Sequence, residues 1–328
     1  MSCFKPLTGW YSKYKNPSGK RSIVFNRNEA LDSYHSLSIP CGQCIGCRLE
    51  KSRQWAIRCS LESQLYQNSY FLTLTYDDEH LPKSGSLVPE DLQKFLKKLR
   101  RYIEYHGSDS KIRFFACGEY GENFSRPHYH AIIYNLQILD LRRFSTSFSG
   151  DIYYTSETIN KIWQNGYVII GQVTFESCAY VARYVTKKIT GSQADEYYQG
   201  RQPEFVRMSR RPGIGSAWLD LYKKDVYPHD YIVIREGIKV KPPKYFDRIF
   251  ESIAPDEMAI IKKLRSVKGY ESLLSDMKLR DIVPYSRGNS FHSARDFNQM
   301  ANEFLILPVK EAVQKAKFAQ LKRGFESE

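Results

Sequence analysis

The chain has 328 residues, of which 42% are hydrophobic and 14% aromatic, so it is long enough for one large domain or two smaller ones. Its formal net charge of +13 favours a polyanionic partner, most often a nucleic acid; the alternative is a merely soluble basic protein. No stretch approaches the roughly 20 apolar residues that span a bilayer, and the N-terminus lacks the apolar core of a signal peptide. We therefore expect a non-secreted, cytoplasmic protein with no membrane partner, whose seven cysteines do not form a disulfide framework.

Secondary structure can be predicted for most of the first 190 residues. Residues 48–66 have the apolar spacing of an amphipathic helix. The elements predicted after it are a strand at 70–76, a helix from Pro89 to Ile103, strands at 111–120 and 128–134, a helix near 153–164, a strand at 166–173, and a helix at 175–190 closed by Gly191. This order predicts an α+β fold close to a split β-α-β sandwich, with a mainly antiparallel sheet and helices on one of its faces.

The composition changes after about residue 192. SRRPGIGS at 209–216 is a basic glycine loop, helical patterns begin at about 245, and 308–324 is typical of a terminal basic helix. We therefore expect four segments: a Cys-rich basic N-terminal segment at 1–69, a core at 70–192, a basic loop region continuing the core at 193–240, and a helical C-terminal region at 241–328.

Three cysteines have the spacing of metal ligands, C-x-x-C-x-x-C: Cys41, Cys44 and Cys47. A tetrahedral structural zinc needs four ligands, and Cys3 is our candidate for the fourth, with Cys59 and His35 as alternatives. The same spacing begins an iron–sulfur run, but the fourth cysteine followed by proline is missing. The remaining alternative is three free cysteines in a loop.

A histidine pair opens the strand at 128–134. Side chains at i and i+2 of a strand point to the same face, so His128 and His130 face one way and Tyr129 the other. Glu119 ends the preceding strand and is expected to lie beside His128 across the hairpin. Two histidines and a carboxylate suit a divalent ion such as Mg²⁺ or Mn²⁺. The alternative is an incidental pair, one member of which is a core residue.

Two tyrosines stand four apart on the helix predicted at 175–190. Tyr180 and Tyr184 share a face of it, and their alternative role is core packing. Beside a metal site, each hydroxyl could attack a phosphodiester and hold the DNA as a phosphotyrosine. Lys187 and Lys188 could stabilise the phosphate or the phenolate, since a phenol of pKa near 10 is a poor nucleophile at neutral pH.

Three segments in this order, FLTLTYDDEHLP, GEYGENFSRPHYHAIIY and YVARYVTKK, resemble the three motifs of the HUH endonucleases, which start rolling-circle replication. The two tyrosines resemble the replication-initiator branch. The segments PCGQCIGCRLEKSRQWAIR and SRRPGIG add a resemblance to the replication initiation proteins of gokushovirus-type microviruses. The resemblance covers about residues 1–220 and implies an HUH core with a central antiparallel sheet.

The resemblance implies a reaction sequence. One tyrosine nicks the single-stranded viral origin and becomes joined to the 5′ phosphate, while the free 3′ hydroxyl primes a host polymerase. After one round the second tyrosine attacks the regenerated origin, and the released end is joined into a circle. The sequence contains no G-x-x-x-x-G-K-[ST] motif, so we expect no nucleotide cofactor and a host helicase for unwinding. Which tyrosine acts first stays open.

Basic clusters are the candidate DNA-binding residues, although single runs of this kind are usually solvated faces: Arg48, Lys51, Arg53, Lys97, Lys98, Arg101, Arg126, Arg210 and Arg211. Several of them around a nicking site would form a DNA track, with tyrosines and Trp163 stacking on unpaired bases.

Two other functions remain. One is another HUH enzyme, a plasmid initiator, relaxase or transposase, against which the cysteine segment argues. The other is a non-enzymatic, zinc-stabilised DNA-binding regulator.

Overall fold

The computed structural model describes seven stretches of the chain: 3–17, 19–107, 109–121, 124–147, 150–187, 193–278 and 306–319. The described residues divide into two compact units, one made of those in 3–50, 259–278 and 306–319 and the other of those in 51–258. The four segments predicted from the sequence stay a prediction. No helix in the described stretches is long and apolar enough to cross a membrane.

The first unit contains a small antiparallel sheet that the sequence did not predict. Its strands lie in the order β2-β1-β3: β1 (Leu7–Lys15), β2 (Arg21–Val24) and β3 (Leu37–Ile39). A short 3₁₀ helix, η1 (Arg27–Glu29), follows β2. The unit also contains most of α8 (Pro255–Lys278) and all of α10 (Ile306–Ala319).

The second unit is built on a seven-stranded sheet whose pairings are all antiparallel, in the order β10-β5-β6-β4-β9-β8-β7. The strands are β4 (Ser69–Tyr76), β5 (Arg113–Tyr120), β6 (Pro127–Tyr134), β7 (Arg142–Thr146), β8 (Ile152–Thr155), β9 (Gly166–Gln172) and β10 (Phe205–Met208). The mixed α/β fold with a large antiparallel sheet and the four predicted strands are confirmed. Because β6 lies between β4 and β5 and is antiparallel to both, β4 and β5 are parallel.

The helices of this unit correct the prediction near 153–164. The elements are α1 (Ile45–Ser63), of which residues 51–63 belong to this unit, α2 (Pro89–Tyr105), α3 (Glu157–Trp163) and α4 (Phe175–Lys187). Residues 152–155, IYYT, form β8 instead of the start of a helix, because β-branched and aromatic residues favour a strand. Ser156 then caps α3, and its hydroxyl accepts the N–H of Ile159. Gly191, expected to close the last helix, lies outside the described residues.

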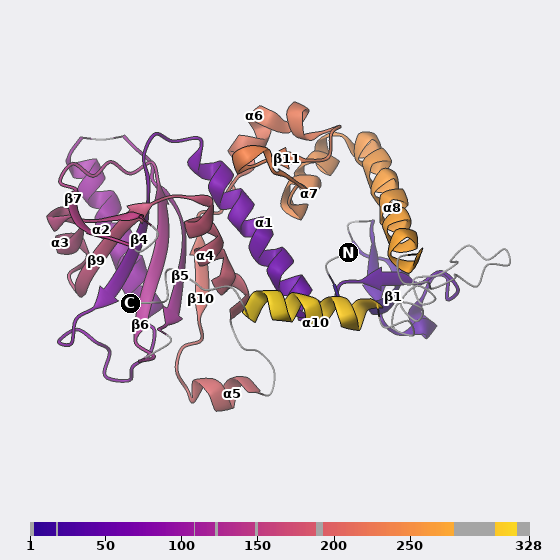
Figure 1. The fold of residues 1–328 in the computed structure, drawn as a ribbon, viewed down its shortest axis with the longest axis horizontal. Coiled ribbons are helices and arrows are strands. Elements are labelled where there is room, and N and C mark those ends of the chain that lie inside the picture. The colour runs from indigo at the N-terminus through magenta and orange to yellow at the C-terminus, as the bar shows by residue number, and fades with distance from the viewer. Residues whose placement is uncertain are drawn as a thin grey trace. The chain divides into compact units, whose positions relative to one another are not determined.

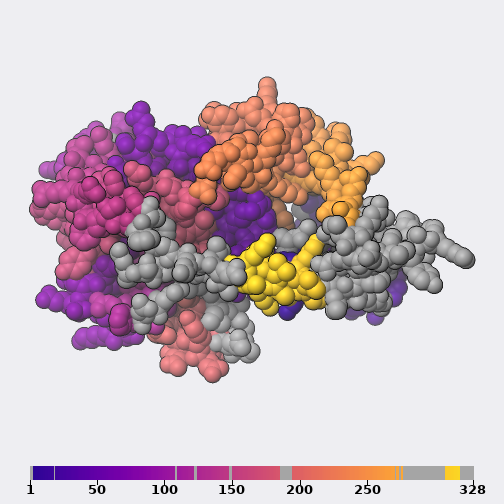
Figure 2. Space-filling model, viewed as in Figure 1, coloured from indigo at the N-terminus to yellow at the C-terminus, as the bar shows by residue number. Residues whose placement is uncertain are grey.

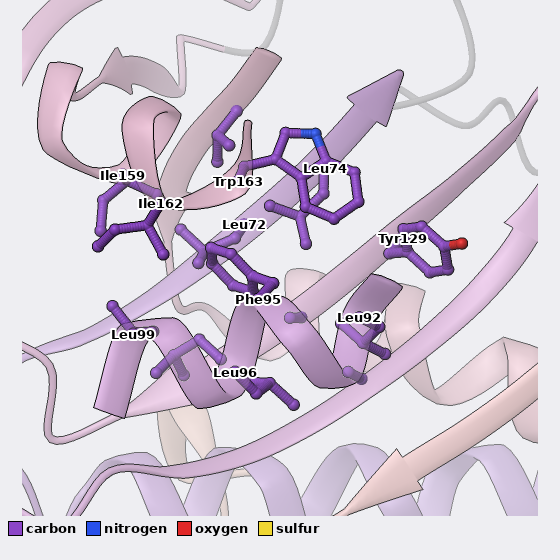
Figure 3. Close-up of a cluster of buried hydrophobic side chains, with 14 of the residues drawn as sticks. Leu72, Leu74, Leu92, Phe95, Leu96, Leu99, Tyr129, Ile159, Ile162 and Trp163 are labelled. Atoms are coloured by element: carbon purple, nitrogen blue, oxygen red, sulfur yellow. The ribbon is translucent and has the colours of Figure 1, made fainter. Parts of the chain in front are cut away.

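Helices cover both faces of the large sheet, so the expectation of one covered face is wrong (Figure 1). The α2 and α3 side carries Leu72, Leu74 and Tyr129, packed against Phe95 and Trp163 (Figure 3). The α4 and α1 side carries a second cluster: Cys59, Phe71, Phe115, Cys117, Ile132, Tyr134, Cys178, Tyr180, Val181, Tyr184 and Ile214. Strand β6 has apolar residues on both faces, and a sheet with two apolar faces needs other elements packed on each of them.

Trp163 belongs to this core, so the expectation that it stacks on DNA bases is wrong. Its side chain is buried against Tyr76 and Phe95, and its indole N–H donates to the carbonyl oxygen of Thr75 at 2.9 Å. The last residue of α3 therefore anchors that helix to the sheet.

The remaining elements follow β9 and α4 in the chain. They are α5 (Gln193–Tyr198), α6 (Ser216–Val226), β11 (Ile232–Val233), η2 (Arg235–Gly237), β12 (Lys239–Val240) and α7 (Lys244–Ile253). The predicted helical patterns after about 245 are confirmed as α7 and α8. The predicted terminal helix is confirmed as α10, which lies at the surface (Figure 2). Residues 320–324 lie outside the described stretches.

Candidate metal and tyrosine site

The pairing of β5 with β6 brings the predicted ligand trio together. Glu119 lies directly opposite His128, and Cys117 lies opposite His130. The two histidines point to the face of the sheet that α4 covers. Oε1 of Glu119 lies 2.9 Å from Nε2 of His128 and 2.7 Å from Nε2 of His130. One carboxylate oxygen therefore contacts both rings.

The carboxylate is almost fully buried, and Glu119 is only 2% exposed. Burial raises the pKa of this carboxyl, but the hydrogen bonds from His128 and His130 outweigh burial and hold the pKa well below its usual range. Glu119 therefore stays ionised in a dry pocket, where a negative charge needs a proton-bearing or cationic partner.

The Nδ1 atoms of both histidines bond to groups outside this centre. Nδ1 of His128 lies 3.1 Å from the carbonyl oxygen of Arg126, which can only accept, so Nδ1 carries a proton there. Nδ1 of His130 lies 3.0 Å from the hydroxyl of Thr73. Nε2 of each ring faces Oε1 of Glu119, so the three ligand atoms point to one spot. Such second hydrogen bonds are typical of metal-ligating histidines.

The donor set fits a divalent cation. Glu119, His128 and His130 each offer a ligand atom, and these atoms lie within 4.8 Å of one another. Neighbouring ligands of an octahedral ion with bonds of 2.0–2.1 Å lie about 3 Å apart, close to the 2.7 and 2.9 Å between the carboxylate oxygen and the two nitrogens. Mixed nitrogen and oxygen ligation suits Mn²⁺ or Mg²⁺ and leaves positions open.

Helix α4 places both predicted tyrosines at this centre. The Tyr180 hydroxyl donates to Oε1 of Glu119 at 3.2 Å and lies 3.5 Å from Nε2 of His130. The ring of Tyr184 stacks on His130, with centroids 6.0 Å apart and planes 20° apart. The two tyrosine rings meet edge to face at 5.3 Å. Residues four apart on a helix thus reach one spot on the sheet.

The phenols are protonated in this environment. Burial raises the pKa of Tyr180 and of Tyr184 well above the usual value, and the charge of Glu119 raises both further. The sequence analysis missed Arg183, whose guanidinium lies 4.7 Å from the centroid of the Tyr180 ring. Its position three residues after Tyr180 on a helix was the available signal. Lys187 ends α4, but its side chain and all of Lys188 lie outside what the structure describes.

In the other unit, Cys3 joins Cys41, Cys44 and Cys47, whose sulfurs all lie within 4.8 Å of one another. Sγ of Cys3 lies 3.7 Å from Sγ of Cys41 and 3.9 Å from Sγ of Cys44. Tetrahedral zinc with Zn–S bonds of about 2.3 Å requires sulfurs about 3.8 Å apart. The cluster therefore fits a zinc ion.

The two alternative fourth ligands lie elsewhere. Cys59 is a residue of α1 buried in the core of the second unit, and the exposed His35 bonds to Asp32. Burial raises the pKa of the Cys44 thiol, but the N–H groups of Phe4 and Cys47 outweigh burial and lower the pKa to about 7. One sulfur of the cluster is thus close to the thiolate form that binds metal.

The predicted DNA-binding residues occupy different surfaces. Lys97, Lys98 and Arg101 are exposed on α2, so the large sheet lies between them and the histidine pair. Arg126 is bonded to Asp78 at 2.7 Å and to the carbonyl oxygen of Tyr76 at 3.1 Å.

The remaining predicted residues lie on α1 and the 209–216 loop. Arg53 donates to the carbonyl oxygen of Lys241 at 3.2 Å. Arg48 and Lys51 are exposed on α1, and Arg210 and Arg211 are exposed at the glycine loop.

The glycine loop at 209–216 is fixed on the same side of the large sheet as α4. The buried carboxylate of Glu62 on α1 accepts the N–H of Gly215 at 2.6 Å and pairs with the guanidinium of Arg113 on β5. Nε of Arg58 donates to the carbonyl oxygen of Ile214 at 2.9 Å, and Arg113 donates to that of Pro212 at 2.8 Å. The loop therefore has a defined conformation.

Comparisons with known proteins cover the part of the chain that contains this site. A family model described as replication-associated protein ORF2 matches residues 69–189, which include the ligand trio and both tyrosines. Replication-associated protein ORF2 of Spiroplasma virus 4 is 41% identical over 276 residues, covering 78% of this chain and 82% of that protein. Replication-associated protein VP4 of Bdellovibrio phage phiMH2K is 31% identical over 333 residues, covering 98% of each chain.

Replication-associated protein ORF4 of Chlamydia phage 1 is 29% identical over 258 residues, covering 73% of this chain and 63% of that protein. No solved structure matches the chain. The identity to the Spiroplasma virus 4 protein and the extent of both chains that it covers establish the relationship. The chain belongs to the family of microvirus replication-associated proteins, as the resemblance in its motifs predicted.

Proposed function

We propose that this replication initiator is a metal-dependent, origin-specific single-stranded DNA endonuclease and strand transferase. It initiates and terminates rolling-circle replication of a small single-stranded DNA phage genome through a 5′-phosphotyrosine intermediate. The observation that carries the proposal is the hydrogen bond from Tyr180 to Glu119, the carboxylate that contacts both His128 and His130. The names of the relatives, replication-associated proteins of small phages, support the same role.

The fold supports the proposal as well. Strands β4 and β5 are parallel, α2 connects them, and antiparallel β6 lies between them. This is the split β-α-β arrangement, and β4 and β6 are the two inner strands of the subset β5-β6-β4-β9. We assign residues 70–192 to an HUH endonuclease core of this topology.

In the proposed reaction, Glu119, His128 and His130 hold Mg²⁺ or Mn²⁺, which when bound polarises the scissile phosphate and offsets its developing charge. The Tyr180 oxygen forms a bond to phosphorus as the bond from phosphorus to the 3′ oxygen breaks. The phenol loses its proton and the 3′ oxygen, in net, gains one and leaves as a hydroxyl. The new phosphodiester keeps the bond energy, so the later joining step requires no ATP.

Both tyrosines bond to Glu119, and Tyr180 is assigned the first attack because its hydroxyl also lies 3.5 Å from Nε2 of His130. Tyr184, packed against the same histidine, is assigned the second. Lys187 and Lys188 follow on the chain and are proposed to neutralise the phosphate, while Arg210 and Arg211 contact the DNA backbone. A structural zinc at Cys3, Cys41, Cys44 and Cys47 completes the proposal, and host helicase and polymerase supply unwinding and synthesis.

A denaturing gel tests the mechanism. The full-length protein is incubated with labelled single-stranded DNA carrying its own origin, with Mn²⁺ or with EDTA, and zinc content is measured in both samples. Tyr180→Phe, Tyr184→Phe and the double variant are compared with Tyr105→Phe, an exposed tyrosine on α2 that serves as control. We expect a metal-dependent protein–DNA adduct that Tyr105→Phe keeps and only the double variant abolishes.

Two results would contradict the proposal. Tight binding to the origin without any adduct would leave a DNA-binding regulator. Metal-dependent cleavage without an adduct would indicate a simple hydrolase, in which the tyrosines are core residues.

A further inference from the structure

We propose that the small N-terminal sheet, β2-β1-β3, is a second binding surface for single-stranded DNA, separate from the tyrosine site. The choice of DNA as ligand rests on the proposed function. The surface itself rests on three independent features of residues 3–41: an exposed apolar face, a surplus of positive charge, and a cysteine cluster at the end of the sheet.

The first feature is one face of the sheet that stays open to solvent. The register pairs Tyr11 with Ile23 and Leu7 with Ile39, which places all four side chains on that face. Tyr11 is 52% exposed, Ile23 47% and Leu7 46%. A monomeric protein rarely leaves neighbouring large apolar side chains uncovered unless the patch binds something.

Gly9 leaves room on this face for the isoleucine side chains of the neighbouring strands. It lies between Leu7 and Tyr11 on the central strand, and a Cβ placed there would come within 2.5 Å of Cδ1 of Ile39 and 3.1 Å of Cγ2 of Ile23. The isoleucines of the two outer strands therefore lean over the central strand. The result is a continuous apolar surface beside the Tyr11 ring.

The second feature is charge. Residues 1–28 contain six lysines and arginines and no aspartate or glutamate. At the end of the hairpin Lys15 lies directly opposite Arg21, an arrangement that is destabilising in a sheet by itself. Arg21 donates to the carbonyl oxygens of Ser12 and Lys13, which fixes its guanidinium there. A bound anion would offset the repulsion.

The third feature is the cysteine cluster, which holds the strands of the sheet together at one end. An isolated two-stranded hairpin is marginally stable at best, so the hairpin of β1 and β2 needs β3 held against it. Cys3 stands four residues before β1 and Cys41 two residues after β3, at the end where Leu7 pairs with Ile39. The sulfurs of Cys3 and Cys41 lie 3.7 Å apart. The cluster thus ties β1 to β3 at the edge of the apolar face.

Single-stranded DNA matches this combination. Its unpaired bases stack on aromatic rings, and its phosphates bind lysine and arginine without a requirement for sequence. Tyr14 and Phe25, both largely exposed, add rings next to the paired residues. A second copy of the chain fits less well, because it would bring together two segments of the same positive charge.

Fluorescence anisotropy of full-length protein with a labelled oligonucleotide lacking the origin sequence tests the proposal. All proteins carry Tyr180→Phe and Tyr184→Phe and are assayed without Mn²⁺, so that no covalent step contributes. We expect Tyr11→Ala with Phe25→Ala to raise Kd at least about tenfold. Lys15→Gln with Arg21→Gln should reduce the slope of log K against log salt by about 1.4.

Matched variants control for the number of changes. Tyr105→Ala with Phe144→Ala removes two exposed rings of the second unit, and Lys83→Gln with Lys224→Gln removes two exposed charges elsewhere. Tyr11→Phe should retain binding because it retains the ring. Circular dichroism and zinc content establish that each variant is folded.

A Kd for the sheet variants no higher than for the controls would overturn the proposal. So would a loss of self-association in sedimentation with DNA affinity unchanged, which would assign the face to a second copy of the chain. Failure of the nuclease proposal has a different signature: no adduct forms on the cognate origin in the protein with native tyrosines, while the sheet variants still weaken binding.

Discussion

Glu119 organises the candidate site through a single atom. Its Oε1 lies 2.9 Å from Nε2 of His128, 2.7 Å from Nε2 of His130 and 3.2 Å from the Tyr180 hydroxyl. Three side chains from two elements therefore depend on the charge of one buried carboxylate. A neutral replacement of the same shape should leave the packing intact and remove the attraction.

We expect Glu119→Gln to bind Mn²⁺ at least about 10–100-fold more weakly, the loss seen even when an outer partner of a metal ligand is changed. Adduct formation should fall at least in parallel, while affinity for single-stranded DNA stays within about threefold, because binding is governed by surface cations. Titration calorimetry, the adduct gel and an anisotropy titration measure the three quantities. Glu196→Gln, an exposed acid on α5, is the control. A normal rate of adduct formation in Glu119→Gln would remove this carboxylate from the site.

The sequence alone was sufficient to predict that the three ligand residues of the β5–β6 hairpin lie together. Residues two apart in a strand share a face, and a nine-residue step to the preceding strand placed Glu119 opposite His128. The sequence alone was not sufficient to predict that Tyr180 contacts Glu119, because the position of α4 over the sheet depends on packing between distant elements. Cys3 could be named only as one of three candidates, since 38 residues separate it from Cys41 and no periodicity connects them.

At the scale of elements, a buried ion pair joins α1 to the sheet and to the glycine loop. Glu62 on α1 is fully buried, pairs with Arg113 on β5 and accepts the N–H of Gly215 at 2.6 Å. Arg58, one turn earlier on α1, lies between the rings of Trp55 and Tyr245, 3.9 and 3.8 Å from their centroids. Helix α1 is therefore the support on which Arg210 and Arg211 are presented.

Glu62→Gln should destabilise the second unit by about 3–5 kcal/mol, because it leaves the charge of Arg113 without its buried partner. Urea unfolding followed by tryptophan fluorescence measures the change. Glu104→Gln on the exposed side of α2 should change stability by less than about 0.5 kcal/mol. Equal stabilities of the two variants would show that the loop is held by its backbone contacts alone.

The cysteine cluster also acts at the scale of elements, and removing its metal tests whether it stabilises β1 to β3. We expect one zinc per chain, with the four cluster thiols protected from a thiol reagent. A strong chelator should release the zinc, expose these four thiols and accelerate amide hydrogen exchange in β1 to β3. Cys59, Cys117 and Cys178 are buried in the other unit and should stay unreactive. Zinc-free protein with unchanged exchange in β1 to β3 would contradict a structural role for the cluster.

Elements with strong periodicity were predictable, and the weakly patterned ones were not. Helix α2 and strands β4, β5 and β6 match their predicted ranges within a few residues. Strand β1, LTGWYSKYK, has a glycine between Leu7 and Tyr11 and an aromatic residue, Trp10, beside Tyr11, so its apolar residues do not alternate regularly. The second covered face was missed because the run AIIY in β6 was interpreted only as a strand, although four consecutive buried residues imply cover on both sides.

At the scale of the whole second unit, the sheet separates two groups of cations. Arg210 and Arg211 lie on the loop held by α1, on the α4 side, whereas Lys97, Lys98 and Arg101 lie on α2 across the sheet. Along β5, the loop contacts Phe114, and Glu119 is five residues further on, about 17 Å at 3.3–3.4 Å per residue. A short single strand could therefore reach from the tyrosines to the loop but not to α2.

Arg210→Gln with Arg211→Gln should weaken binding of an origin oligonucleotide of about 10 nucleotides and reduce the salt slope by about 1.4, because two phosphate contacts are lost. Lys97→Gln with Arg101→Gln removes the same charge on the other face and should leave affinity within about twofold. Anisotropy titrations over a range of salt, in the Tyr180→Phe and Tyr184→Phe background, measure both. If the α2 variant loses as much affinity as the loop variant, the DNA must pass over both faces of the sheet, and the α2 cations belong to its path. If only the loop variant loses affinity, the path runs along β5 on the α4 side, and the α2 cations form a solvated surface.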